Sequence, residues 1–197
     1  AGPDVEFEQR PAGDSAPGYG YNGPGFHFLK NVERDDDPGS QFSVDWQIKD
    51  YYGVRKDDAD IHLRLTMLND VDDVALADGV PPRNKPGNPP SLRYLIAHRQ
   101  GTNLDSLFTS VIEPYKDERY IESIEQVPVT MDGEPADQDV RAVKVTLKNG
   151  RTDYIVSALN PDVTYTVDGK FTFKGAFGVY SEKKGVQVYG YVMQGSQ

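Results

Sequence analysis

The chain has no cysteine and only three histidines among its 197 residues. The lack of cysteine excludes disulfide bonds, thiolate catalysis and cysteine-ligated zinc sites. No apolar run approaches the roughly 20 residues that a membrane-spanning helix needs, so we expect no membrane partner. No signal-peptide pattern is visible, and the opening residues AGPD are interpreted as the start of a mature or excised fragment.

Basic residues are also scarce. The chain has 21 lysines and arginines and 31 acidic residues, which gives a net charge of −10. Duplex nucleic acid requires a concentrated basic face, so we expect no nucleic-acid partner. The excess of acid lies in residues 1–80, whereas residues 81–197 are balanced. An anionic polysaccharide could therefore be received only by a local basic patch.

The sequence shows no convincing helical periodicity. Apolar and polar residues instead alternate with a period of two. Apolar residues alternate with polar ones over residues 42–49 and again over 61–67. Residues 91–127 hold three more β-rich runs, which are separated by QGTN at 100–103 and by EPYKD at 113–117. Such alternation indicates strands with one buried face and one face in solvent.

Turn signals complete a β pattern. Residues 10–25 are rich in glycine and proline, and residues 79–90 contain five prolines, so both segments are predicted loops. Asn149-Gly150 and Asp168-Gly169 indicate hairpins, because a type I′ turn needs positive φ at both central residues. We predict an all-β, two-sheet antiparallel β-sandwich, formed as a single domain by residues 1–197. Its expected core comprises Phe42, Val44, Trp46, Ile48, Leu63, Leu65, Tyr94, Ile96, Phe108 and Val111.

Five stretches carry a family resemblance. They are VDW at 44–46, LRLTML at 63–68, LRYL at 92–95, SLFTSVIEPYK at 106–116 and AVKVTLKNGRTDYIVS at 142–157. In this order they resemble the C-terminal β-rich region of bacterial heparinase II/III-type polysaccharide lyases, over roughly Phe26 to Tyr191.

The resemblance implies a secreted bacterial accessory sandwich that acts as a carbohydrate-binding module. It implies an acidic polysaccharide such as chondroitin sulfate, dermatan sulfate or hyaluronan as ligand, and an appended catalytic lyase domain as partner. The helical toroid and the HxHxD-type segment of such lyases are missing, and His27, His62 and His98 are isolated. We therefore expect no catalytic residues. A purely structural accessory sandwich and a catalytic lyase fragment stay open as alternatives.

The predicted ligand site is a basic strand face. Arg93 and Arg99 share one side of a strand, and His62 and Arg64 share one side of another. If both strands lie in one sheet, their side chains could bind sulfate or carboxylate bidentately, with Arg83 and Lys85 at one end. The alternative is a solvated face whose arginines pair with aspartates. A second basic cluster, Arg141, Lys144, Lys148 and Arg151, is interpreted as edge-strand protection.

Loop residues supply two further predictions. Tyr51 and Tyr52, in the segment DYYG, are candidate stacking platforms for sugar rings, as are Tyr19 and Tyr21. Acidic clusters at 35–37, 57–60 and 69–73 could hold a structural Ca²⁺, with Asp70, Asp72 and Asp73 as the candidate ligands. Solvated acidic turns are the alternative, because no cluster matches the EF-hand pattern.

Overall fold

The computed structural model describes residues 28–55, 57, 59–80, 85–136 and 138–195, together with the backbone of Glu8 and Gln9. Most of these residues lie in β-strands, and none of them forms an α-helix. All strand pairs are antiparallel, so the predicted all-β, sandwich-like fold is confirmed. No helix in the described ranges is long and apolar enough to cross a membrane.

The strands are distributed over four sheets. Their bounds are β1 Glu8–Gln9, β2 Leu29–Asp35, β3 Phe42–Gln47, β4 Ile61–Met67, β5 Asp73–Gly79, β6 Leu92–His98, β7 Ser110–Lys116, β8 Ile121–Gln126, β9 Val129–Met131, β10 Glu134–Pro135, β11 Val140–Leu147, β12 Arg151–Ala158, β13 Thr164–Val167, β14 Phe171–Lys174, β15 Phe177–Lys183 and β16 Val186–Met193. The sheet orders are β1-β2-β5-β6, β3-β4-β7, β16-β15-β12-β11-β8 and β10-β9-β13-β14.

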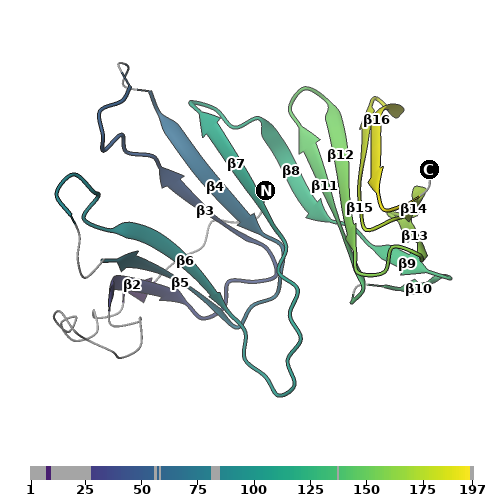
Figure 1. The fold of residues 1–197 in the computed structure, drawn as a ribbon, viewed down its shortest axis with the longest axis horizontal. Helices are drawn as coiled ribbons and strands as arrows, with labels where there is room; N and C mark the ends of the chain where they lie inside the picture. Colours follow the sequence, from purple (N-terminus) through teal and green to yellow (C-terminus); the bar gives the residue numbers. More distant parts are fainter. Residues whose placement is uncertain are drawn as a thin grey trace.

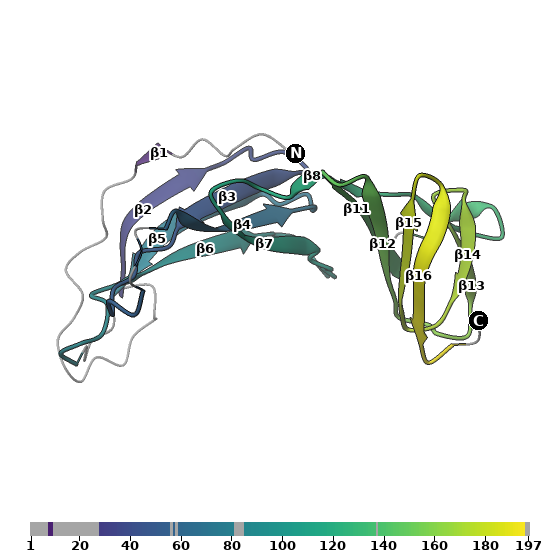
Figure 2. The same cartoon turned by 90° about the horizontal axis from the view of Figure 1, so that it is seen from above.

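The four sheets form an arch with two halves (Figures 1 and 2). Strands β1 to β7 make one half, in which the β1-β2-β5-β6 sheet and the β3-β4-β7 sheet splay apart. Strands β8 to β16 make the other half, in which the five-stranded and four-stranded sheets pack face to face. The chain passes between the halves at the short turn from β7 to β8.

The second half has the larger core. Alternating residues of β11 and β12, such as Ala142 and Val156, pack against Tyr165, Val167 and Phe173 of the facing sheet. Both predicted hairpins form, β11 with β12 and β13 with β14. Asp168 and Gly169 both have positive φ, as a type I′ turn requires, whereas at the other turn only Gly150 does.

The first half has a small core, at the end where its two sheets meet. Phe42, Met67 and Val74 are buried there, with Leu65 and Leu95 packed against them. Of the predicted core, Phe42 and Val44 are buried, while Trp46, Leu63, Leu65, Ile96 and Val111 are half-buried. The prediction is wrong for Ile48, Tyr94 and Phe108, which are exposed. Alternation identifies the apolar face of a strand, but it does not say whether another sheet covers that face.

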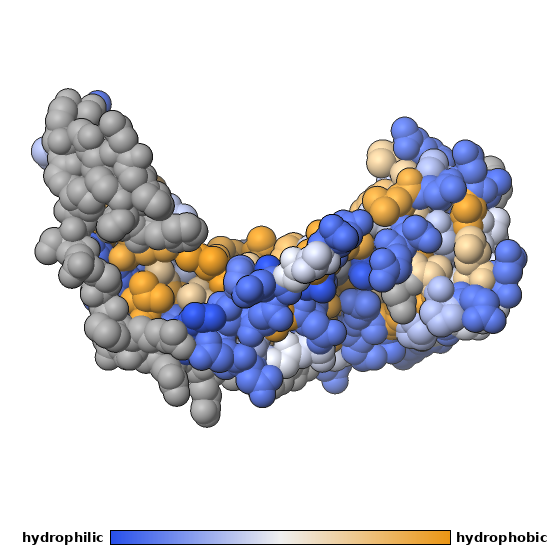
Figure 3. Space-filling model, turned by 90° about the horizontal axis from the view of Figure 1, so that it is seen from below, coloured by the Kyte–Doolittle hydropathy of each residue, from blue (hydrophilic) through white to orange (hydrophobic). Residues whose placement is uncertain are grey.

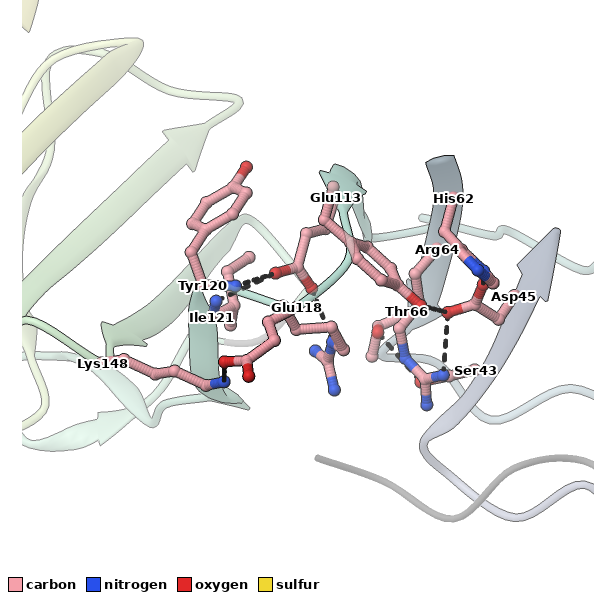
Figure 4. Close-up of polar contacts among 12 residues, drawn as sticks. Ser43, Asp45, His62, Arg64, Thr66, Glu113, Glu118, Tyr120, Ile121 and Lys148 are labelled. Atoms are coloured by element: carbon pink, nitrogen blue, oxygen red, sulfur yellow. Dashed lines mark hydrogen bonds and ion pairs between the residues drawn. The ribbon is translucent and has the colours of Figure 1, made fainter. Parts of the chain in front are cut away.

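Two features connect the halves. A cluster of Leu68, Ile121, Ile124, Val143 and Val145 packs where β8 and β11 approach the end of β4. The carboxylate of Glu113, which is 1% exposed, accepts hydrogen bonds from the backbone N–H groups of Tyr120 and Ile121 (Figure 4). It also pairs with Arg119 at 2.8 Å. One buried acid thereby holds the turn that joins β7 to β8.

Candidate functional site

The predicted basic face does not assemble. Strands β4 and β6 belong to different sheets. Arg64 is only 7% exposed and bonds to Asp45, while Arg93 pairs with Glu33 at 2.7 Å and with Asp78 at 3.2 Å. The expectation that Arg64 and Arg93 share a free solvent face is therefore wrong. Acidic residues on neighbouring strands already neutralise both side chains.

His62 and Arg64 instead belong to a polar layer on one face of the β3-β4-β7 sheet (Figure 4). Asp45 is its centre. The Asp45 carboxylate bonds to His62 Nδ1 at 2.6 Å, to the Tyr115 hydroxyl at 2.7 Å and to Arg64 Nη1 at 3.4 Å. His62 also contacts Asp60 at 3.0 Å, and its ring stacks on that of Tyr115. The sheet thus brings together a tyrosine, a histidine and an arginine that the sequence leaves unconnected.

These contacts shift three pKa values. Burial alone would raise the pKa of Asp45, but the hydrogen bonds from Tyr115, His62 and Arg64 outweigh it, so that pKa is lowered. The Asp45 carboxylate raises the pKa of His62. Burial and the hydrogen bond to Asp45 raise the pKa of Tyr115 to about 12. A tyrosine in this state keeps its proton at neutral pH, which makes it a poor general base.

Other predicted residues lie apart from this layer. Lys85 is exposed, and Arg83 falls outside the described residues, as do His27, Tyr19 and Tyr21. Tyr51 and Tyr52 are exposed in the loop after β3, and their rings meet edge to face at 5.5 Å. The loop placement predicted for these two tyrosines is thus confirmed, while their binding role stays a prediction.

The three candidate calcium ligands have separate surroundings. Asp73 pairs with Arg34 at 2.6 Å and with His98 at 2.9 Å, and these bonds lower its pKa despite burial. Asp72 accepts a hydrogen bond from the backbone of Gln100, and Asp70 lines a cavity between the halves of the arch. Within the described ranges, no group of three or more acids or histidines is placed to hold a metal ion. Calcium binding stays a prediction.

A groove lies between the two halves of the arch. The inner side of the arch carries apolar residues (Figure 3). It combines two adjoining cavities of about 560 and 420 Å³, which share Leu107, Arg141 and Leu159 as lining residues. We call it the junction groove. The segment 105–112 forms one wall, and β11 and β12 form the other. Arg141 has the same strand phase as Val143 and Val145, so its side chain lies on the groove side of β11.

The arginines that line the junction groove differ from the other described arginines in their ion pairs. Six arginines lie within 4.0 Å of a carboxylate, namely Arg34, Arg55, Arg64, Arg93, Arg119 and Arg151. Arg99 and Arg141 are the two arginines in the described part of the chain for which no such carboxylate is found. Among the described residues, Arg99 donates to Ser106 Oγ at 3.2 Å and to a backbone oxygen, and Arg141 donates to the backbone oxygen of Val140. Both guanidinium groups therefore retain spare N–H donors.

The rest of the lining is mixed. Leu107, Phe108 and Ile112 form an exposed apolar ledge, and Phe108 is 46% exposed. The carboxylates of Asp70 and Asp105 line the same cavity as the two arginines. The groove thus offers cationic donors, anionic acceptors and an apolar surface within one hollow. That combination suits a ligand with an acidic group, several hydroxyls and an apolar face.

Sequence reasoning identified Arg99 but missed the roles of Arg141 and Phe108. The interpretation of Arg141 as edge-strand protection is wrong, because β11 lies between β8 and β12 and is not an edge strand. The prediction that Phe108 belongs to the core is wrong as well, because this residue is exposed. The useful signal is the phase of β11, where Arg141 precedes Val143 and Val145 on the same side of the strand. Comparison of the chain with protein-family models, with curated proteins and with solved structures gives no match.

Proposed function

We propose that this chain is a non-catalytic carbohydrate-binding module for acidic polysaccharide, which targets an appended polysaccharide lyase domain to its substrate. The observation that supports the proposal is the junction groove, where Arg99 and Arg141 have no carboxylate partner among the residues that the structure describes and lie beside an exposed phenylalanine. A glycosaminoglycan unit offers a carboxylate or sulfate for the arginines, hydroxyls for Asp70 and Asp105, and C–H faces for the ledge.

The charges of the protein and the ligand determine the expected rate and affinity of this binding. The net charge of −10 repels a polyanion at long range, so association should be slow. At short range, hydrogen bonds to charged groups contribute about 1.5–3 kcal/mol each, and bidentate arginine contacts fix the orientation of the ligand. Affinity should therefore be modest and sensitive to salt.

A glycan panel tests the proposal. Native gels are cast with chondroitin sulfate, dermatan sulfate, hyaluronan or a neutral dextran, and the migration of the protein is compared across them. We expect retardation by at least one acidic polymer and none by dextran. Equal migration in all four gels would overturn the proposal.

A structural accessory role is the second candidate, and a different observation favours it. Large apolar side chains are exposed along the junction groove, including Leu107, Ile112 and Leu159. Contiguous apolar surface of this kind also forms interfaces between domains. A structural sandwich would bury the groove against a catalytic lyase domain and would show no retardation with any glycan.

A catalytic role has weaker support. The cluster around Asp45 contains the residue types that uronate β-elimination uses, but its tyrosine is held protonated and Arg64 is engaged by Asp45. We therefore propose binding without turnover.

A further inference from the structure

A third cavity, of about 700 Å³, lies where the two sheets of the first half splay apart. Its lining comes from β3, β4 and β6, which belong to both sheets, and from the segments 48–51 and 89–91. We call it the aromatic groove. The lining residues are Trp46, Gln47, Ile48, Lys49, Tyr51, Leu63, Pro89, Pro90, Ser91, Leu92, Arg93 and Tyr94.

Three aromatic side chains converge on this groove from separate parts of the chain. Trp46, the only tryptophan, comes from β3, Tyr51 from the following loop and Tyr94 from β6. Tyr51 and Tyr94 are 46% and 47% exposed, so nearly half of the surface of each residue is accessible to a ligand. Exposed aromatic surface of this kind can stack on the apolar face of a sugar ring.

The position of Tyr94 depends on a glycine in the neighbouring strand. Gly79 pairs with Leu92 at the end of β5, and the Tyr94 ring lies directly over it. A Cβ atom at position 79 would stand 2.1 Å from Cε2 of that ring, which is far inside contact distance. Glycine at this position is therefore what allows the Tyr94 ring to lie this close to the backbone of β5.

The charge of the aromatic groove is opposite to that of the chain. Its described lining residues include Lys49 and Arg93 and no aspartate or glutamate, although the chain carries ten more negative than positive charges. Arg93 is neutralised by Glu33 and Asp78, whereas Lys49 forms no ion pair with any described residue. An anionic ligand with apolar faces matches this lining better than a basic or neutral one.

We propose that the aromatic groove is a second sugar subsite, in which Tyr51 and Tyr94 stack on the rings of an acidic polysaccharide and Lys49 contacts its acidic groups. This inference rests on the proposed function. The two grooves are connected by β6, since Tyr94 and Leu92 lie near its start and Arg99 directly follows its end. Seven residues of strand span roughly 23 Å, so a polysaccharide would need several units to reach from one groove to the other.

Tryptophan fluorescence tests this subsite, because Trp46 is the only tryptophan and lines the groove. The purified chain is titrated with hyaluronan and chondroitin sulfate oligosaccharides, with dextran oligosaccharides as the neutral control. We expect a saturable change in emission with the acidic oligosaccharides alone. Y94A, K49Q and G79A should each weaken binding, and Y94A should do so about tenfold, which corresponds to about 1.4 kcal/mol of lost stacking. Y189A, which removes an exposed tyrosine from β16, should bind as the parent does.

The outcomes separate this inference from the proposed function. If acidic polymers retard the protein in gels while emission stays constant and Y94A binds normally, the aromatic groove is not a subsite but the proposed function stands. If no polymer retards the protein, the proposed function is overturned, and the inference that rests on it is overturned with it. If dextran changes the emission as strongly as hyaluronan, the assignment of an acidic ligand is overturned. Circular dichroism of each variant shows that its fold is retained.

Discussion

Arg99 and Arg141 line one cavity, although one directly follows β6 and the other lies in β11 on the far side of the junction. Neither guanidinium group has a carboxylate within 4.0 Å among the described residues, in a chain with a marked excess of acids. Arginines of this kind are available to an external anion, whereas each of the other six arginines that the structure describes is engaged by an internal carboxylate.

Salt should weaken the binding of acidic polysaccharide. The contacts proposed at the junction groove are ionic and partly exposed. Interactions between exposed charges are largely screened beyond about 8 Å at physiological ionic strength, and this distance shortens as salt is raised. We expect retardation by chondroitin sulfate to fall steadily as sodium chloride is raised from low to high concentration. Binding that does not change with salt would indicate that apolar contacts dominate.

Glu113 should be a strong determinant of stability. E113A would leave Arg119 and two backbone N–H groups without their acceptor, which should lower the free energy of unfolding by about 2–4 kcal/mol. Urea denaturation measures this change. The matched control is E118A, since Glu118 is exposed and contacts Lys148 at 3.8 Å, and it should change stability by less than about 0.5 kcal/mol. Equal losses for the two variants would contradict the role of Glu113.

His62 should make stability depend on pH around neutrality. Its folded pKa is raised above the ordinary value of 6.5, mainly by Asp45, so its contribution is fully present below about pH 6.5. That contribution is lost as pH rises through the folded pKa. The difference in unfolding free energy between the parent and H62Q should therefore shrink between pH 6 and pH 8. NMR titration of the ring checks the direction of the shift, and a pKa below 6.5 would contradict it.

Asp45 and Asp73 should make the fold less stable as pH falls, which is the opposite of the effect of His62. Their folded pKa values are lowered from 3.8, so they stabilise the fold above that value and lose this contribution as pH falls through the folded pKa. D45N and D73N should consequently lose less stability on acidification than the parent does. Thermal unfolding at pH 7 and at pH 3 provides the comparison.

The isolated chain should not depolymerise uronate polysaccharides. With its pKa raised to about 12, Tyr115 keeps its proton at neutral pH, so its hydroxyl cannot serve as the base of a β-elimination. Incubation with hyaluronan and chondroitin sulfate should give no increase in the absorbance of unsaturated products. Steady product formation that Y115F abolishes would show that the cluster is catalytic.

Much of the fold was predictable from the sequence, because alternation over residues 42–47 and 61–67 marks the strands directly. The break expected at 113–117 is wrong, since β7 continues through Pro114. Strand β7 is the edge of its sheet, where the missing N–H of proline is tolerated. The sites were less predictable. Alternation places Arg64 and Arg93 opposite the apolar face, but it cannot show that Asp45 and Glu33 on neighbouring strands neutralise them.

The most direct test of the proposed function compares two double variants that lose the same charge. R99Q/R141Q removes the arginines of the junction groove, and K148Q/R151Q removes two cations beside the turn before β12, each of which already contacts a carboxylate. Both variants should unfold at nearly the same temperature as the parent. We predict that R99Q/R141Q migrates freely through gels containing chondroitin sulfate or hyaluronan, while K148Q/R151Q is retarded like the parent. Equal retardation of the two variants would contradict binding of acidic polysaccharide at the junction groove.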